Sequence, residues 1–309
     1  MVFDNKMKHT LKITIILALF FFLAQITGLL IVSQYIDHKK TIETQTVVLK
    51  DLPYGLERPQ VENQSTSFIY IAMAILIGTL LLLLIIKTNI TFLWKIIFFF
   101  SVTLTLSIAF AAFIDPVIAG LLALAISFWR LYRPNPIVHN VSEIFIYGGL
   151  AAFMVNIFNL FAAFMLLILI SLYDYIAVYR TRHMVKLAEF QSKSGVFAGL
   201  FIPYQIEKPV MKASSHKKFP ASKQKPKGSI AVLGGGDIGF TLIFAGVVMK
   251  GLMLHEAVLS AFLITMIIPV FATFALLFLL VKGQQNKFYP AMPILSLGCF
   301  IGYLIVWLL

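Results

Sequence analysis

The stretches LLILISLYDYIAVY (residues 166–179) and SIAVLGGGDIGFTLIF (residues 229–244) decide the fold of this chain. Both are apolar enough to enter a lipid bilayer, and each carries one carboxylate, Asp174 in the first and Asp237 in the second. A carboxylate costs a few kcal/mol or more inside hydrocarbon, so an ionisable residue at such a place indicates a functional site by default. The two aspartates are therefore the first candidates for chemistry in this sequence.

The composition is that of a polytopic helical membrane protein. The 309 residues are 60% hydrophobic and 12% charged, with a mean hydropathy of +0.93, far from the soluble range. Apolar runs of about 17 to 25 residues recur, the length that crosses a hydrocarbon core of about 30 Å. The first run, 11–32, is too long for the apolar part of a signal peptide and is predicted to remain as a span. The single cysteine, Cys299, excludes an intramolecular disulfide and a thiolate metal site.

The apolar runs predict an all-α membrane domain of nine transmembrane helices. The expected spans are 11–32, 68–86, 92–113, 115–130, 142–157, 160–180, 229–249, 256–281 and 289–309. Within this one domain the sequence divides into helices one to six (1–180), a loop (181–228) and helices seven to nine (229–309). Asp115-Pro116 is a good helix start for the fourth span, and Asn156 and Asn159 mark the turn between the fifth and the sixth.

The basic residues predict the orientation of these spans. With a cytoplasmic N-terminus, 20 of the 25 lysines and arginines fall on the inner side, as the positive-inside rule requires. The outer side keeps Lys39, Lys40, Lys50, Arg58 and Lys250. The C-terminus is then expected outside. The net charge of +12 follows from this topology and does not indicate a nucleic-acid partner.

Two regions are predicted to lie outside the spans. Residues 33–67 form an outer loop that is partly ordered against the helices. In the long cytoplasmic loop, 182–191 suits a helix on the membrane surface, 195–204 is an apolar run too short to span, and 208–227 is Lys-, Ser- and Pro-rich and predicted to be disordered.

Helix geometry brings the two aspartates to one level. Asp174 lies six residues before the cytoplasmic end of its span near Arg180, and Asp237 lies eight residues after the start of its span at Ser229. At about 1.5 Å per residue these depths are about 9 and 12 Å. Two carboxyls close together in a medium of low dielectric share one proton, so one can activate water while the other hydrogen-bonds a scissile carbonyl. No metal or other cofactor is expected, because the six histidines are scattered.

Gly234, Gly235 and Gly236 precede Asp237 and admit two interpretations. In a helix interior each glycine costs about 1 kcal/mol, which indicates loosened backbone beside the carboxylate, where an extended peptide could fit. Alternatively, Gly235 and Gly239 are four residues apart and form a close helix contact.

Pro290-Ala291-Met292-Pro293 opens the ninth span on the side where both aspartates lie. Two prolines in a first turn remove backbone donors that have no helical partner, so the segment also fits an ordinary helix start.

Taken together, Tyr173-Asp174, Gly234-x-Gly236-Asp237 and Pro290-Ala291-Met292 resemble the presenilin and signal peptide peptidase family of intramembrane aspartyl proteases. The resemblance implies that Asp174 and Asp237 are the catalytic pair. It also places the Pro-Ala-Leu motif of the family at Pro290, Ala291 and Met292. Methionine for leucine conserves volume, so the role of the motif is compatible with this change.

The resemblance also implies partners and location. Substrates would be transmembrane peptide segments in the lipid bilayer, without nucleic acid and without obligate protein partners. The predicted orientation matches presenilins, and the short single chain is similar to a microbial, archaeal homologue, which implies the plasma membrane of a prokaryote. Prepilin peptidases share Gly-x-Gly-Asp but lack the other two elements.

A proton- or cation-coupled transporter that uses Asp174 and Asp237 is the alternative from another class. Such transporters usually contain inverted repeats with paired broken helices, and no second glycine-broken span matches the seventh.

The segments around the aspartates also predict how a substrate is held. An unwound substrate must satisfy its backbone groups inside the membrane, and pairing with an extended segment would do this. We expect 195–204, 228–233 or both to become β-structured beside a bound substrate, next to Pro290 to Met292.

Overall fold

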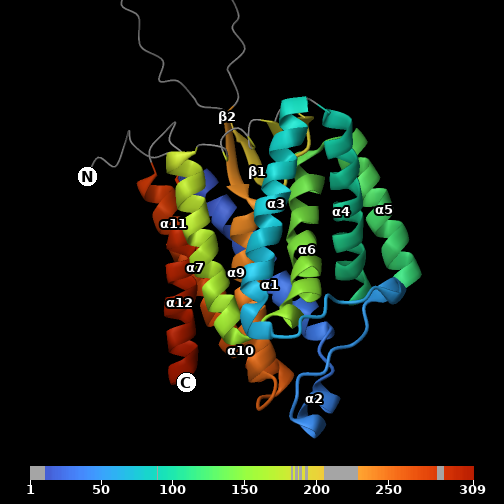
Figure 1. Ribbon diagram of the computed structural model, residues 1–309, viewed down its shortest axis with the longest axis vertical. Coiled ribbons are helices and arrows are strands. Elements are labelled where there is room, and N and C mark those ends of the chain that lie inside the picture. Colours follow the sequence, from blue (N-terminus) through green and yellow to red (C-terminus); the bar gives the residue numbers. More distant parts are fainter. Residues whose placement is uncertain are drawn as a thin grey trace, which may run out of the picture.

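The computed structural model describes residues 11–88, 90–181, 184, 187, 190, 191, 194–204, 229–283 and 289–309. Its long helices run roughly parallel to one another, and a two-stranded hairpin lies at one end of the bundle (Figure 1). The C-terminal end of the last helix lies at the opposite end.

The helices lie in the predicted apolar runs, but the fifth begins at Pro136 and not at 142, and the predicted span 256–281 is divided into two helices. They are α1 (Leu11–Gln34), α3 (Ser67–Thr88), α4 (Thr91–Ala111), α5 (Pro116–Tyr132), α6 (Pro136–Met154), α7 (Leu160–Tyr175), α9 (Gly235–Leu252), α10 (Val258–Thr265), α11 (Ile267–Lys282) and α12 (Met292–Leu308). Among the described residues, seven helical stretches are long and apolar enough to cross a membrane. The helices α5 and α12 are equally apolar in character but only 17 residues long.

Two predicted helix starts are confirmed by their caps. The Asp115 carboxylate accepts a hydrogen bond from the backbone N–H of Val117 at 2.9 Å and caps α5. The Asn159 side chain accepts one from Ala162 at 2.8 Å and caps α7. A single 3₁₀ turn, η3 (Val155–Ile157), separates α6 from α7, so the division of this 39-residue stretch into two helices is correct.

The prediction of an all-α fold is wrong in one respect. Residues Gly199–Tyr204 form β1 and Ser229–Gly234 form β2, which pair antiparallel from Gly199 opposite Gly234 to Tyr204 opposite Ser229. The seventh helix therefore begins at Gly235 and not at 229. The run Ser229–Gly234 is short and contains Ile and Val, so its sequence fits a helix or a strand equally well. Pairing with Gly199–Tyr204 satisfies the backbone hydrogen-bonding groups between the two strands.

The surface helix predicted at 182–191 and the disordered segment predicted at 208–227 cannot be compared in full, because the first lies largely, and the second wholly, outside the described residues.

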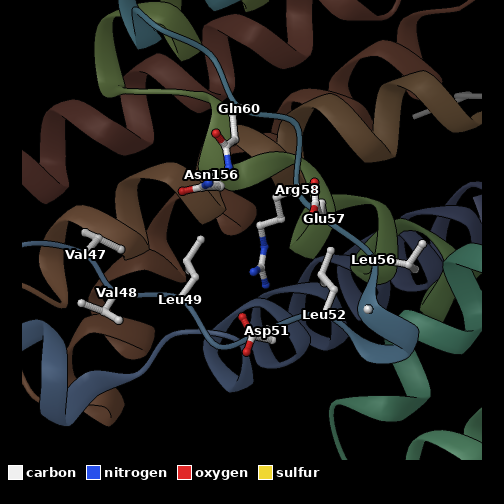
Figure 2. A pocket seen from close by; sticks show the side chains of 11 residues that line it. Val47, Val48, Leu49, Asp51, Leu52, Leu56, Glu57, Arg58, Gln60 and Asn156 are labelled. Atoms are coloured by element: carbon white, nitrogen blue, oxygen red, sulfur yellow. The ribbon is translucent and has the colours of Figure 1, made fainter.

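The loop 33–67, predicted to be partly ordered, contains regular structure and lies at the end of the bundle opposite the hairpin (Figure 1). It contains α2 (His38–Thr44), two 3₁₀ turns, η1 (Pro53–Gly55) and η2 (Gln64–Thr66), and a bridge between Ile36 and Leu49. Figure 2 shows a cavity of about 570 Å³ under this loop, with Arg58 reaching into its centre. The cavity is lined by residues 47–60 and Asn156, so it is separate from every residue predicted to act in chemistry.

Candidate active site

Asp174 is the penultimate residue of α7 and is held by the start of α12. The residue is 5% exposed, and its Oδ2 accepts a hydrogen bond from the backbone N–H of Met292 at 3.1 Å. A π-helical turn, η4 (Ile176–Arg180), follows directly. Such turns occur often at functional sites because they break the regular helix ladder.

Asp237 is the third residue of α9 and lies in its first turn. The predicted depth of eight helical residues is wrong, because the preceding six residues form β2. The carboxylate lies against Gly234, where a Cβ would be 3.3 Å from Oδ2. The N-terminus of a helix is its positive end, a favourable place for an anion. Asp237 lies close enough to Asp174 for the two carboxyls to interact electrostatically.

The three glycines lie at a strand-to-helix junction. Gly234 ends β2 and caps α9 with extended backbone (φ −65°, ψ 145°), and Gly235 and Gly236 open the helix. The cost of glycine in a helix interior therefore does not arise here. A Cβ at Gly235 would meet the Tyr147 hydroxyl at 2.6 Å, and one at Gly239 would lie 3.7 Å from the same ring. The close helix contact predicted as the alternative is thus present, between α9 and Tyr147 of α6.

The Pro290-Ala291-Met292 segment lies directly beside Asp174. Pro290, Ala291 and Met292 are buried, with Met292 only 2% exposed, and Ala291 precedes the first residue of α12. The sequence placed this segment on the same side as the aspartates, and the hydrogen bond from Met292 gives it a specific partner there.

Tyr173 turns to the neighbouring helix α3. Its hydroxyl shares a hydrogen bond of 2.9 Å with the Thr79 hydroxyl. The residue is thus adjacent to Asp174 in the chain, and it links α7 to α3.

Sequence reasoning missed a group of buried polar residues on α5 and on α6, the helix that packs against α9. Arg130, His139, Glu143 and Tyr147 are 2–7% exposed and are joined by hydrogen bonds. Glu143 was available as a signal, since it is ionisable and lies at the edge of a predicted span. Arg130 was counted among free cytoplasmic charges, but it is buried in an ion pair with Glu143.

The part of the chain that the structure describes contains no group of three or more His, Cys, Asp or Glu side chains placed to hold a metal ion.

These features define a class of protein: a multi-pass membrane protein with two carboxyls close enough to interact electrostatically, an intramembrane aspartic protease. The chain belongs to the signal-peptide peptidase, presenilin aspartyl protease family, which matches residues 16–309. It is accordingly an integral membrane aspartic endopeptidase.

Two solved structures of a presenilin family intramembrane aspartate protease share the fold. The first, in space group C222, is 19% identical, with a TM-score of 0.59 over 96% of this chain and 98% of that one. The second, in space group P2, is also 19% identical, with a TM-score of 0.57 over 94% and 96%. A comparison with curated proteins finds no significant match.

Proposed function

We propose that Asp174 and Asp237 form a catalytic dyad that hydrolyses peptide bonds within transmembrane segments of other membrane proteins. The observation that carries the proposal is that two carboxyls, from helices distant in sequence, lie close enough to interact electrostatically at the end of an apolar bundle that carries the β-hairpin. Two acids at such a place destabilise the fold, because the carboxylates repel each other and lose their hydration. Their presence therefore favours a chemical role.

The pair would work by sharing one proton. The ionised carboxylate takes a proton from a water molecule, whose oxygen attacks the scissile carbonyl carbon, while the protonated partner hydrogen-bonds the carbonyl oxygen. Collapse of the tetrahedral intermediate breaks the C–N bond, and the amine leaves with a proton from the dyad. The Met292 N–H would keep the Asp174 carboxyl oriented through these steps.

The outer edge of β2 is the proposed place for an unwound substrate. Asn140 of α6 occupies the other edge of the hairpin, because its side chain both donates to the Phe201 carbonyl at 2.8 Å and accepts from the Phe201 N–H at 3.0 Å. The backbone groups of Phe201 thus point away from β2. In an antiparallel pair the groups of the opposite residue, Val232, then point away from β1. An extended substrate segment could bond to them by strand addition.

A proline at Val232 tests this arrangement. It removes an N–H on the free edge and leaves the β1–β2 bonds in place, so hairpin and helix are expected to persist. Cleavage should fall more than the binding of a small inhibitor directed at the two aspartates. If both fall equally, the start of α9 has collapsed and strand addition loses its support.

The proposed topology has nine spans, with α5 and α12 crossing despite their length. The N-terminus and the loop between β1 and β2 would be cytoplasmic and Leu309 outside, in the plasma membrane of a prokaryote. The enzyme would act without an obligate partner. In a Cys299→Ser background, a membrane-impermeant thiol reagent applied to intact cells should label Glu62→Cys and spare Ser222→Cys. The reverse pattern would invert the topology.

The decisive experiment is cleavage of a single-span peptide by purified full-length protein in detergent, with products identified by mass spectrometry. The intact chain should cut within the apolar segment, and Asp174→Ala and Asp237→Ala should each abolish the cut. Appreciable activity in either variant would refute the dyad.

A further inference from the structure

A chain of buried polar side chains connects α5, α6 and α9 next to the proposed dyad. Arg130 of α5 forms an ion pair with Oε1 of Glu143 on α6, and the Tyr147 hydroxyl donates to the other oxygen, Oε2. All three residues are buried, at 5%, 2% and 5% exposure. Both carboxylate oxygens of Glu143 therefore have charged or hydroxyl partners, which fixes the rotamers of all three side chains.

The Arg130 end of this chain holds the segment that enters β1. Arg130 Nη2 donates to the Phe197 carbonyl at 3.0 Å, and Nε2 of the neighbouring His139 lies 2.7 Å from the Gly199 carbonyl. These contacts set where the hairpin begins relative to α5 and α6.

The Tyr147 end reaches the first turn of α9. A Cβ added at Gly235 would lie 2.6 Å from the Tyr147 hydroxyl oxygen. A Cβ added at Gly239, one turn later, would lie 3.7 Å from the same ring. The Gly235 N–H donates to the Ala198 carbonyl at 3.2 Å, which links the start of α9 to the residue before β1. Tyr147 also lies close enough to Asp237 for the two groups to interact electrostatically.

We propose that Tyr147, oriented by Glu143 and Arg130, is a positioning residue that fixes Asp237 relative to the hairpin on which the substrate would lie. The inference rests on the proposed function, since it assigns residues to the same site. A buried ion pair is weak evidence for stability, because apolar side chains of similar volume often stabilise a fold as well. Here one chain of bonds contacts both the strand entering the hairpin and the turn that carries the carboxyl. A displacement of about 1 Å between a reacting bond and its catalytic group can cost about 100-fold in rate.

Tyr147→Phe tests the inference with the smallest change. The ring and its packing against Gly235 and Gly239 remain, and only the hydroxyl is lost. We expect kcat to fall at least tenfold with KM within about twofold, and the cleavage site in a single-span peptide to spread over neighbouring bonds. Glu143→Gln should do the same, because it loses the charge that orients the hydroxyl.

Tyr35→Phe is the matched control at the other end of the bundle. Tyr35 is also 5% exposed, and its hydroxyl donates to the Ile108 carbonyl at 2.7 Å, so the change removes one buried hydrogen bond far from the hairpin. Its Tm should fall by about as much as that of Tyr147→Phe, with kcat and the cleavage site unchanged. If Tyr147→Phe also keeps kcat within twofold and the same cleavage site, Tyr147 is merely structural and the inference is overturned.

A double variant provides a second, independent readout. Gly235→Ala should lose most but not all activity, because the new Cβ would lie 2.6 Å from the Tyr147 hydroxyl oxygen. Adding Tyr147→Phe removes the closest atom and should restore at least threefold activity over Gly235→Ala alone. No restoration would show that the hydroxyl does not set this turn.

Asp237→Asn separates this failure from failure of the proposed function. If it keeps activity, the dyad and the inference fall together. If it abolishes cleavage while Tyr147→Phe is neutral, only the inference falls.

Discussion

Each end of α9 carries an ionisable side chain, Lys250 buried in the last turn and Asp237 partly exposed in the first turn, and the surroundings of the two differ. Lys250 in the last turn is 8% exposed, and its ammonium donates to the carbonyls of Val155 at 3.0 Å and Phe158 at 2.7 Å. Asp237 in the first turn lies against Gly234 and is close enough to Asp174 for the two carboxyls to interact electrostatically.

The difference separates a charge that completes backbone hydrogen bonding from one that we propose acts in catalysis. The ammonium of Lys250 meets carbonyls exposed where α6 ends, so the cation completes backbone hydrogen bonding and favours that helix end. The carboxyl of Asp237 lies near a group that repels it when both are ionised. Burial alone therefore does not mark a catalytic residue in a membrane protein; the identity of its partners does.

The largest expected effect is that of Asp237→Asn and Asp174→Asn. An amide can hydrogen-bond but cannot exchange the proton, so kcat should fall by about 10³-fold or more. Stability should be unchanged or higher, because the amide carries no charge that must be desolvated. The cleavage rate of the purified protein measures kcat, and its thermal unfolding measures stability. A clear loss of stability would make Asp237 a structural residue like Lys250 and remove the contrast.

The three glycines at the start of α9 should rank by the space beside them. A Cβ would lie 2.6 Å from the nearest side-chain atom at Gly235, 3.3 Å at Gly234 and 3.5 Å at Gly236. Gly235→Ala should destabilise by about 1–3 kcal/mol through overpacking and lose most activity. Gly234→Ala should mainly displace the Asp237 carboxyl and lower kcat less, and Gly236→Ala should fold as the parent does. Circular dichroism melts with matched cleavage rates would reveal any other order.

Lys250→Met should reduce stability and spare chemistry. The aliphatic chain still fills the site, but two buried carbonyls lose their donor, which costs about 1–3 kcal/mol. Activity per folded molecule should remain that of the parent, since the change lies at the end of α9 remote from Asp237. If Lys250→Met lowers kcat as much as Asp237→Asn does, both ends of α9 serve the reaction.

The same contrast explains how far the sequence could predict the structure. Runs of apolar residues located the helices, and two acids within them gave the candidate site, whose role stays a prediction. Residues 195–204 and 228–233 were expected to become β-structured beside a bound substrate, and they do contain strands, but these strands pair with each other. Ser229 to Leu233 was also assigned to the seventh helix, because so short a run does not distinguish strand from helix by periodicity. Arg130 and Lys250 were assigned to loops because a charge near a span end is normally solvated, and only tertiary contacts reveal their buried partners.

The smallest effect is expected at the Pro-Ala-Met segment, where the family resemblance implies leucine in place of Met292. The group that contacts Asp174 is the backbone N–H of this residue, which every amino acid but proline supplies. Met292→Leu conserves volume at a site that is 2% exposed, so stability should change by less than about 1.5 kcal/mol. The cleavage rate should stay within about twofold. Met292→Ala provides the control, since the cavity that it leaves should cost about 2–5 kcal/mol while the N–H remains. If Met292→Leu instead lowers kcat tenfold at unchanged stability, the thioether itself contacts the substrate, and Asp174 depends on a side chain as well as on a backbone donor.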